Sequence, residues 1–185
     1  MDWIKKAKDL GFDAAAFFNP QTLQAREDVR EMCAADKCHS YNKSWTCPPA
    51  CGTIEECQEK MTRFANGLLL QTTGHLKTTF DSKMYQLTGE RHQRNFSSFS
   101  DLIRKTYPDS LCLGAGPCQV CKTCAYPNPC RFPDRALSSM EAYGLFVIHV
   151  CKEAGLPYYY GKNTITYTAC VLYNDTKSLE GLHSR

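Results

Sequence analysis

The spacing of hydrophobic and polar positions predicts that helices and strands alternate along this chain. Residues 2–11 have the pattern of a short helix, and residues 14–18, Ala-Ala-Ala-Phe-Phe, have that of a strand. A second helix is expected over residues 22–32, leading directly to Cys33. A cysteine-rich loop then follows these three elements.

The middle of the chain carries clearer boundary signals. Thr53 and Glu56 have the spacing of a capping box, in which each side chain satisfies a backbone N–H group at the start of a helix. We therefore expect a helix over residues 53–64 and, after it, a buried strand over residues 67–74. Residues 80–105 also favour a helix, although their hydrophobic period is weak.

Ser138 and Glu141 repeat the capping-box spacing and predict the start of another helix. That helix is expected over residues 142–155, and because it is apolar on nearly all sides we expect it at the centre of the core. Two strands, residues 157–161 and 164–173, are expected to follow. Their β-branched and aromatic residues suit a hairpin or a sheet edge with one buried face.

Together these elements predict the α+β class, with one domain over residues 1–175 and a polar C-terminal tail over residues 176–185. In this domain helices cover a sheet, and two cysteine-rich loops lie at the ends of elements. Of the 185 residues 43% are hydrophobic and 22% are charged, which is typical of a globular domain with a full core. The net charge of +3 gives no reason to expect nucleic acid or an anionic membrane as a partner.

Twelve cysteines change this picture, because so many thiols need an explanation. Disulfides would explain them in a secreted protein. However, the N-terminal residues lack the charged start, apolar run and cleavage site of a signal peptide, and no apolar run approaches the length of a membrane span. We therefore expect a cytoplasmic protein, in whose reducing surroundings clustered cysteines more often bind metal or take part in catalysis.

The more specific cysteine cluster follows a strand expected over residues 110–116. It reads Cys-x2-Cys-x2-Cys-x5-Cys, and its candidate ligands are Cys118, Cys121, Cys124 and Cys130. In bacterial ferredoxins a run of Cys-x2-Cys-x2-Cys-x3-Cys-Pro holds iron–sulfur clusters, because short arches turn successive thiolates inward. The last spacing here is two residues longer. It therefore leaves open whether Cys130 ligates the same cluster as the other three.

A second candidate site is formed by Cys33, Cys38, Cys47 and Cys51. Four thiolates suffice for one cluster, although this spacing is less specific. His39 is an alternative ligand, while Trp45 and Tyr41 could either shield a cluster from water or pack in the core. Zinc is the alternative metal, but a structural zinc site is typically built from two Cys-x2-Cys arms far apart in the sequence.

The four remaining cysteines are expected to fill the core, where a free cysteine behaves as a small hydrophobic residue. Cys57 and Cys151 fall on apolar helix faces, and Cys170 lies in the last expected strand. Cys112 is also assigned to the core, with a role as a spare ligand as its alternative. Other chemistry is scarce, since the chain has neither a phosphate-binding glycine loop nor two histidines at helical spacing.

Three segments together resemble a known family, namely CHSYNKSWTCPPACG, AGPCQVCKTC and PCRFPDRALSSMEAYGLFV. They are similar to predicted metal-binding proteins of anaerobic bacteria and archaea that are catalogued as a domain of unknown function. The resemblance covers roughly residues 33–173 and implies iron–sulfur clusters held by the eight cysteines of the two loops. It also implies that Arg131 and Glu141 support the cluster loop, although helix capping and salt bridges are the simpler roles for both.

Three functions compete on these grounds. The first is an electron carrier that delivers low-potential electrons from two 4Fe–4S clusters to a redox partner protein. The second is a reductase that acts on a small substrate beside one cluster, with Tyr41, His39 or Arg131 facing a pocket. The third is an interaction module that is stabilised by zinc. Simple ferredoxins hold two clusters in far fewer residues, so most of this chain serves some further purpose, and the oligomeric state stays open.

Overall fold

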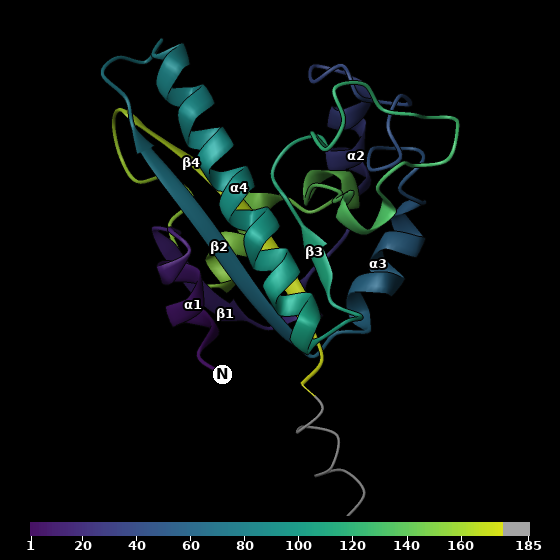
Figure 1. Cartoon of the computed structure of the whole chain (residues 1–185), viewed down its shortest axis with the longest axis horizontal. Helices are drawn as coiled ribbons and strands as arrows, with labels where there is room; N and C mark the ends of the chain where they lie inside the picture. Colours follow the sequence, from purple (N-terminus) through teal and green to yellow (C-terminus); the bar gives the residue numbers. More distant parts are fainter. Residues whose placement is uncertain (176–185) are drawn as a thin grey trace, which may run out of the picture.

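A four-stranded antiparallel sheet forms the centre of the protein, with its strands in the order β1-β2-β4-β3. The computed structural model describes residues 1–175. The strands are β1 (Ala14–Phe18), β2 (Asn66–His75), β3 (Leu111–Leu113) and β4 (Thr164–Tyr173). β2 and β4 pair along their whole length, from Asn66 opposite Tyr173 to His75 opposite Thr164. The predicted α+β class is confirmed (Figure 1).

Helices cover both faces of this sheet. They are α1 (Trp3–Asp9), α2 (Glu27–Ala34), α3 (Ile54–Thr62), α4 (Ser82–Thr106) and α5 (Val147–Glu153), with short 3-10 turns η1 (Pro20–Thr22), η2 (Pro133–Arg135) and η3 (Glu141–Tyr143). Because side chains alternate along a strand, β2 contributes to two cores. Leu68 and Leu70 join the cluster that includes Phe99 of α4, whereas Leu69 joins the cluster that includes Met61 of α3.

The helix α3 begins as its sequence predicts. The Glu56 backbone N–H donates to the Thr53 hydroxyl at 3.2 Å, and the Thr53 backbone N–H donates to the Glu56 carboxylate at 2.8 Å. The capping box is therefore confirmed. It fixes the point at which the chain leaves the first cysteine-rich loop and enters a helix that packs on the sheet.

The helix α4 is confirmed and is the longest in the described residues, with 25 residues. Its buried stripe contains Thr88, His92 and Ser100 as well as Phe96, Phe99 and Ile103. This explains its weak hydrophobic period, because three of these six buried positions are polar. Asp81 caps the helix by accepting a hydrogen bond from the Met84 backbone N–H at 3.1 Å.

The single helix predicted over residues 142–155 is wrong. Gly144 has a φ of +73° and divides the segment into the turn η3 and the short helix α5. The Arg26 backbone N–H donates to the Gly144 carbonyl at 2.9 Å, and a Cβ on Gly144 would lie 2.8 Å from that same nitrogen. Close approach of a distant backbone segment therefore requires the glycine and interrupts the helix. The capping box predicted at Ser138 does not form, and the Ala142 backbone N–H donates instead to the Ser139 hydroxyl.

The two strands predicted near the C-terminal end also need correction. Residues 157–161 form no strand, and Tyr158, Tyr159 and Tyr160 are exposed. β4 is confirmed as a strand, but it lies inside the sheet between β2 and β3 rather than at an edge. Its second half is buried on both faces, which explains why Ala169 to Tyr173 form an unbroken apolar run.

Three further predictions concern the start of α2, membrane-spanning helices and the C-terminal tail. The helix predicted over residues 22–32 begins later, at Glu27, because residues 23–26 form no helix after the turn η1 and are extended at Leu23 and Arg26. No helix within residues 1–175 has both the length and the apolar character needed to cross a membrane. The tail predicted over residues 176–185 lies outside the described residues.

Candidate metal centre

Two loops carry the eight candidate ligands and lie side by side in the upper right of Figure 1. The first cysteine loop (residues 33–51) connects α2 to α3, and the second cysteine loop (residues 118–130) follows β3. Trp45 joins the two loops, since its Nε1–H donates to the Asn128 carbonyl at 2.7 Å and its ring lies 5.0 Å from that of Tyr126. Tyr126 in turn donates its hydroxyl proton to Asn42 Oδ1 at 3.1 Å. The loops therefore form one unit.

The structure brings several of the predicted ligands together across this contact. Burial raises the pKa of the Cys47 thiol in the first loop, and the neighbouring thiols of Cys38 and Cys118 raise it slightly further. Cys51 and Cys130 line one hollow of about 640 Å³, which also opens on Trp45. Predicted ligands from both loops thus lie at this contact.

The candidate ligands differ in exposure. Cys47 and Cys51 are buried, Cys38 is exposed, and the remaining five, Cys33, Cys118, Cys121, Cys124 and Cys130, are partly buried. All twelve cysteines of the chain lie in the described residues as free thiols. No three histidine, cysteine, aspartate or glutamate side chains of residues 1–175 already converge on one point that could hold a metal ion.

The donor groups of the two loops nevertheless fit a metal centre. Thiolates are soft ligands that favour zinc and iron–sulfur clusters. No backbone N–H of residues 115–124 donates a hydrogen bond to another described residue, although Pro117 alone lacks the group. Unpaired N–H groups beside thiols are suited to donate to metal-bound sulfur. The second cysteine loop therefore offers thiols and free N–H groups of the kind that a metal centre uses.

The pKa values of the thiols follow from their surroundings. Burial raises the pKa of Cys33 and of Cys47, and the nearby Glu141 carboxylate raises that of Cys33 further. For Cys124 burial also acts to raise the pKa, but hydrogen bonds from the backbone N–H groups of Tyr126 and Trp45 outweigh it and hold the pKa below its usual value. Cys124 is thus stabilised as a thiolate by a residue from the other loop.

Sequence reasoning missed Arg30, which lies under the first cysteine loop. Its Nε–H donates to the Ala142 carbonyl at 2.8 Å, and its Nη2 donates to the Gly52 carbonyl at 2.7 Å and to Cys57 Sγ at 3.4 Å. Arg30 therefore ties α2, the end of the first loop and the turn η3 to one another. Only its position three residues before Cys33 hinted at this role.

Cys57 was assigned to the core and is fully buried there. It also lies against the first cysteine loop, because its thiol donates to the Cys51 carbonyl at 3.9 Å. The neighbouring Cys51 thiol, with help from the positive charge of Arg30, lowers the pKa of Cys57 below its usual value. The other three core assignments are confirmed, since Cys112, Cys151 and Cys170 are each buried.

The residues expected to support or shield the cysteine loops differ in how well the structure fits the roles predicted for them. Arg131 donates to the Thr123 carbonyl across the second loop, so it bridges the backbone rather than forming a salt bridge. The capping and salt-bridge role expected for Glu141 is wrong, because its Oε2 is buried without a hydrogen-bond partner in the described residues. His39 is exposed and Tyr41 is partly buried, whereas Trp45 is 37% exposed and covers the junction of the loops.

Comparison with known proteins agrees with this site. A family described as predicted metal-binding protein (DUF2284) matches residues 16–173, which include all eight candidate ligands. The chain belongs to this family. Membership supports the binding of metal, while the description of the family names neither the metal nor a reaction. No curated protein and no solved structure matches the chain.

Proposed function

We propose that this protein binds two 4Fe–4S clusters and transfers low-potential electrons to a redox partner protein. The observation that carries the proposal is the contact of two cysteine loops, which places eight thiols and a run of unpaired backbone N–H groups in one part of the molecule. The Cys-x2-Cys-x2-Cys run of the second loop favours a cluster over a single zinc ion.

The residues that would hold the clusters are the eight cysteines of the loops, Cys33, Cys38, Cys47, Cys51, Cys118, Cys121, Cys124 and Cys130. When bound, the clusters supply one-electron chemistry. The protein contributes thiolate charge, hydrogen bonds to sulfur and protection from water. Trp45 and Tyr126 cover the junction between the loops, and the exposed position of Cys38 gives electrons a short path to the surface.

A reductase is the second candidate, and one observation favours it. A cleft of about 900 Å³ borders Cys118, which lies in the partly buried second loop. A simple carrier has no use for a cavity of this size, whereas ligand sites commonly have such volumes. The residues expected to face the pocket of a reductase, Tyr41, His39 and Arg131, do not line this cleft.

The deciding experiment measures iron, acid-labile sulfide and zinc in protein purified without oxygen, with EPR spectra before and after addition of dithionite. Two clusters correspond to about eight irons and about eight sulfides per chain, and reduction should produce EPR signals. Zinc without sulfide, in a colourless protein that does not react with dithionite, would instead establish the interaction module.

Matched cysteine variants test the ligand assignment. Cys121→Ala should remove about four irons per chain, because a cube that loses a thiolate ligand becomes unstable. Cys170→Ala is the control, since this thiol is fully buried in the sheet and should affect packing alone. Equal loss of iron from both variants would show that the assignment is wrong.

A further inference from the structure

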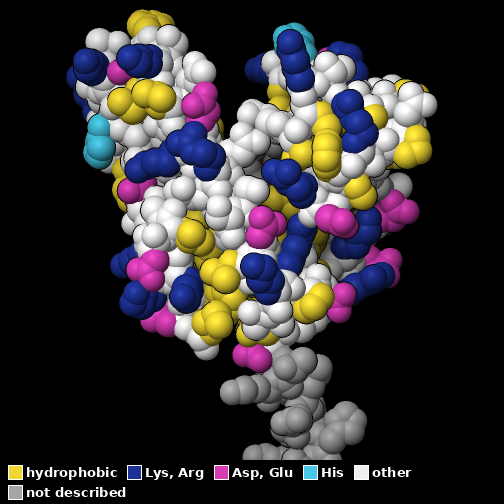
Figure 2. Space-filling view, viewed as in Figure 1, with side chains coloured by type: hydrophobic (Ala, Val, Ile, Leu, Met, Phe, Trp, Pro, Cys, Tyr) yellow, Lys and Arg dark blue, Asp and Glu magenta, His cyan; other side chains and the backbone are white. Residues whose placement is uncertain are grey.

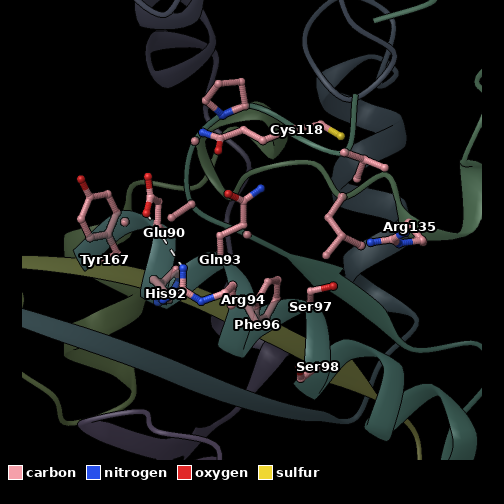
Figure 3. Close-up of a pocket in the computed structure, with 18 of the residues that line it drawn as sticks. Glu90, His92, Gln93, Arg94, Phe96, Ser97, Ser98, Cys118, Arg135 and Tyr167 are labelled. Carbon is pink, nitrogen blue, oxygen red and sulfur yellow. Dashed lines mark ion pairs between the residues drawn. The ribbon is translucent and has the colours of Figure 1, made fainter. Parts of the chain in front are cut away.

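The cleft beside Cys118 lies between α4 and the segment of residues 114–120. Figure 2 shows the surface hollowed between α4 and the two cysteine loops, and Figure 3 shows the residues that line this hollow. One wall is the outer side of α4, and the other is the backbone that leaves β3 for the second loop. The cleft thus joins the helical layer to the candidate metal centre.

The floor of the cleft is apolar and fixed. Phe96 is only 3% exposed, and the partly buried Leu137 packs against the core cluster that contains Phe96. Tyr167 closes one end, where its hydroxyl donates to the Tyr85 carbonyl at 3.1 Å. A Cβ on Gly89 would lie 3.2 Å from the Tyr167 ring, so the glycine leaves room for this aromatic side chain against the helix. A flat apolar ligand would meet a preformed surface here.

Polar groups without partners stand above this floor. The Gln93 amide projects into the cleft and the Ser97 hydroxyl lies farther along it (Figure 3). Neither side chain makes a hydrogen bond to any described residue, which leaves their donors and acceptors available. Small-molecule sites are commonly lined by apolar side chains, with a few polar groups that point into the pocket.

Charge in the cleft is unevenly distributed. Toward the Tyr167 end, Glu90 and Arg94 form an ion pair at 4.0 Å (Figure 3). Arg135 stands at the opposite end, and its guanidinium makes no ion pair or hydrogen bond within residues 1–175. A guanidinium presents a planar array of donors that matches a carboxylate or a phosphate. The Arg135 end is therefore suited to an anion.

We propose that this cleft binds a small organic anion. A flat apolar body would lie on Phe96 and Leu137, with its polar edge at Gln93 and Ser97. A terminal carboxylate or phosphate would pair with Arg135, and the ligand would then lie beside Cys118. The inference goes beyond electron transfer, and it does not depend on which metal the cysteine loops hold.

The test uses calorimetric titration of the metal-loaded protein with three probes that share one aromatic body. Naphthoate carries a carboxylate, naphthyl phosphate carries a phosphate, and naphthylmethanol is neutral. We expect about one anionic probe per chain, bound about tenfold more tightly than the alcohol, because a charge-assisted hydrogen bond contributes that much. The anion that binds more tightly shows whether the site prefers a carboxylate or a phosphate.

Three variants locate the binding. Arg135→Gln should weaken the anions about tenfold and leave the alcohol unchanged, since it removes only the charge. Ser97→Trp should abolish binding of all three probes by filling the cleft. Arg63→Gln is the control, because Arg63 is an exposed arginine at the end of α3 that does not line the cleft.

The proposal is overturned if the alcohol binds as tightly as the anions, or if Arg135→Gln and Arg63→Gln behave alike. Absence of binding by both calorimetry and ligand-observed NMR would overturn it too. Circular dichroism and metal content, measured on every variant, separate loss of the site from loss of the fold. Because metal content and the response to dithionite are measured independently, failure of the cleft proposal is distinguishable from failure of the iron–sulfur proposal.

Discussion

At the scale of single residues, Arg30 holds several segments of the chain together. Its three hydrogen bonds connect segments that are far apart in the sequence, and the groups that accept them are two carbonyl oxygens and one thiol. We expect Arg30→Gln to lower the free energy of unfolding by about 3 kcal/mol, because hydrogen bonds to a charged group are lost and partly buried carbonyls remain unpaired. Urea unfolding of the purified variant measures this change.

The control for Arg30 is again Arg63. It forms an ion pair with Glu59 at 2.6 Å, but both side chains are mostly exposed. Arg63→Gln should therefore change stability by less than about 0.5 kcal/mol. Arg30→Lys should retain the charge and still lose most of the stability, since a lysine cannot bond both carbonyls in the plane of a guanidinium. Full rescue by lysine would contradict the proposed role.

His92 is expected to make the stability of the protein depend on pH. Burial, and to a lesser degree the charge of Arg91, lowers the pKa of His92 to about 4. The unfolded chain then binds a proton that the folded chain excludes. The free energy of unfolding therefore does not depend on protonation of His92 above its ordinary pKa of about 6.5. As the pH falls from there toward about 4, the free energy of unfolding decreases by up to about 1.4 kcal/mol per pH unit.

The measurement compares urea unfolding at about pH 7 and about pH 5 for the wild type and for His92→Gln. The variant keeps a polar group near Thr72, whose Oγ1 lies 2.9 Å from His92 Nδ1, but it cannot titrate. Its loss of stability in acid should be smaller than that of the wild type. Identical losses would mean that His92 does not control this response, because any acid sensitivity of the metal centre is common to both proteins.

At the scale of elements, the contact between β2 and α4 depends on one glycine. A Cβ on Gly74 would lie 2.0 Å from Thr88 Oγ1, a distance that no relaxed structure permits. Gly74→Ala should therefore destabilise the protein by about 1–3 kcal/mol, the usual effect of excess volume in a packed interior. Thermal and urea unfolding would both report the change.

A second substitution provides the matched control for this contact. Thr88→Ala removes the hydroxyl that the new methyl group would strike, so the double variant should recover part of the stability lost by Gly74→Ala alone. Simple addition of the two effects would show that the helix and the strand do not meet as described.

The same elements show how much a sequence reveals. The capping box at Thr53 and the unbroken apolar run of β2 are local signals, and both elements formed as predicted. The break at Gly144 depends instead on the backbone of Arg26, more than a hundred residues away, and no local pattern contains that contact. The central place of β4 was missed for a related reason, because an aromatic strand reads alike at an edge and in the middle.

In the candidate site, too, some features could be predicted from the sequence and others could not. Cysteine spacing identifies the two loops, since ligand spacing is a local property of the chain. The contact between Trp45 and Asn128 and the cleft under Cys118 arise only when distant segments fold together. Spacing alone could not reveal either feature.

At the scale of the whole molecule, Trp45 is expected to couple the two cysteine loops. Trp45→Phe keeps a ring beside Tyr126 but removes the donor to the Asn128 carbonyl. We expect metal to leave for a chelator about fivefold faster, which corresponds to the loss of one hydrogen bond of about 1 kcal/mol. Absorbance during the chelator challenge follows the release.

The other tryptophan of the chain is the control. Trp3 is 3% exposed and packs against Phe99 on one face of the sheet. Trp3→Phe should lower stability and leave the rate of metal release unchanged. If both variants release metal at the same faster rate, the effect belongs to the general stability of the fold and not to the coupling of the loops.

The position of β4 has a consequence for how each molecule is made. β4 follows all eight candidate ligands in the chain, yet it is the strand that joins β2 to β3. On the ribosome both cysteine loops therefore emerge before the strand that anchors the second of them. Until β4 inserts, the nascent chain exposes eight thiols without the framework that aligns them. We therefore expect metal to be loaded late, after completion of the sheet rather than on synthesis of the ligands.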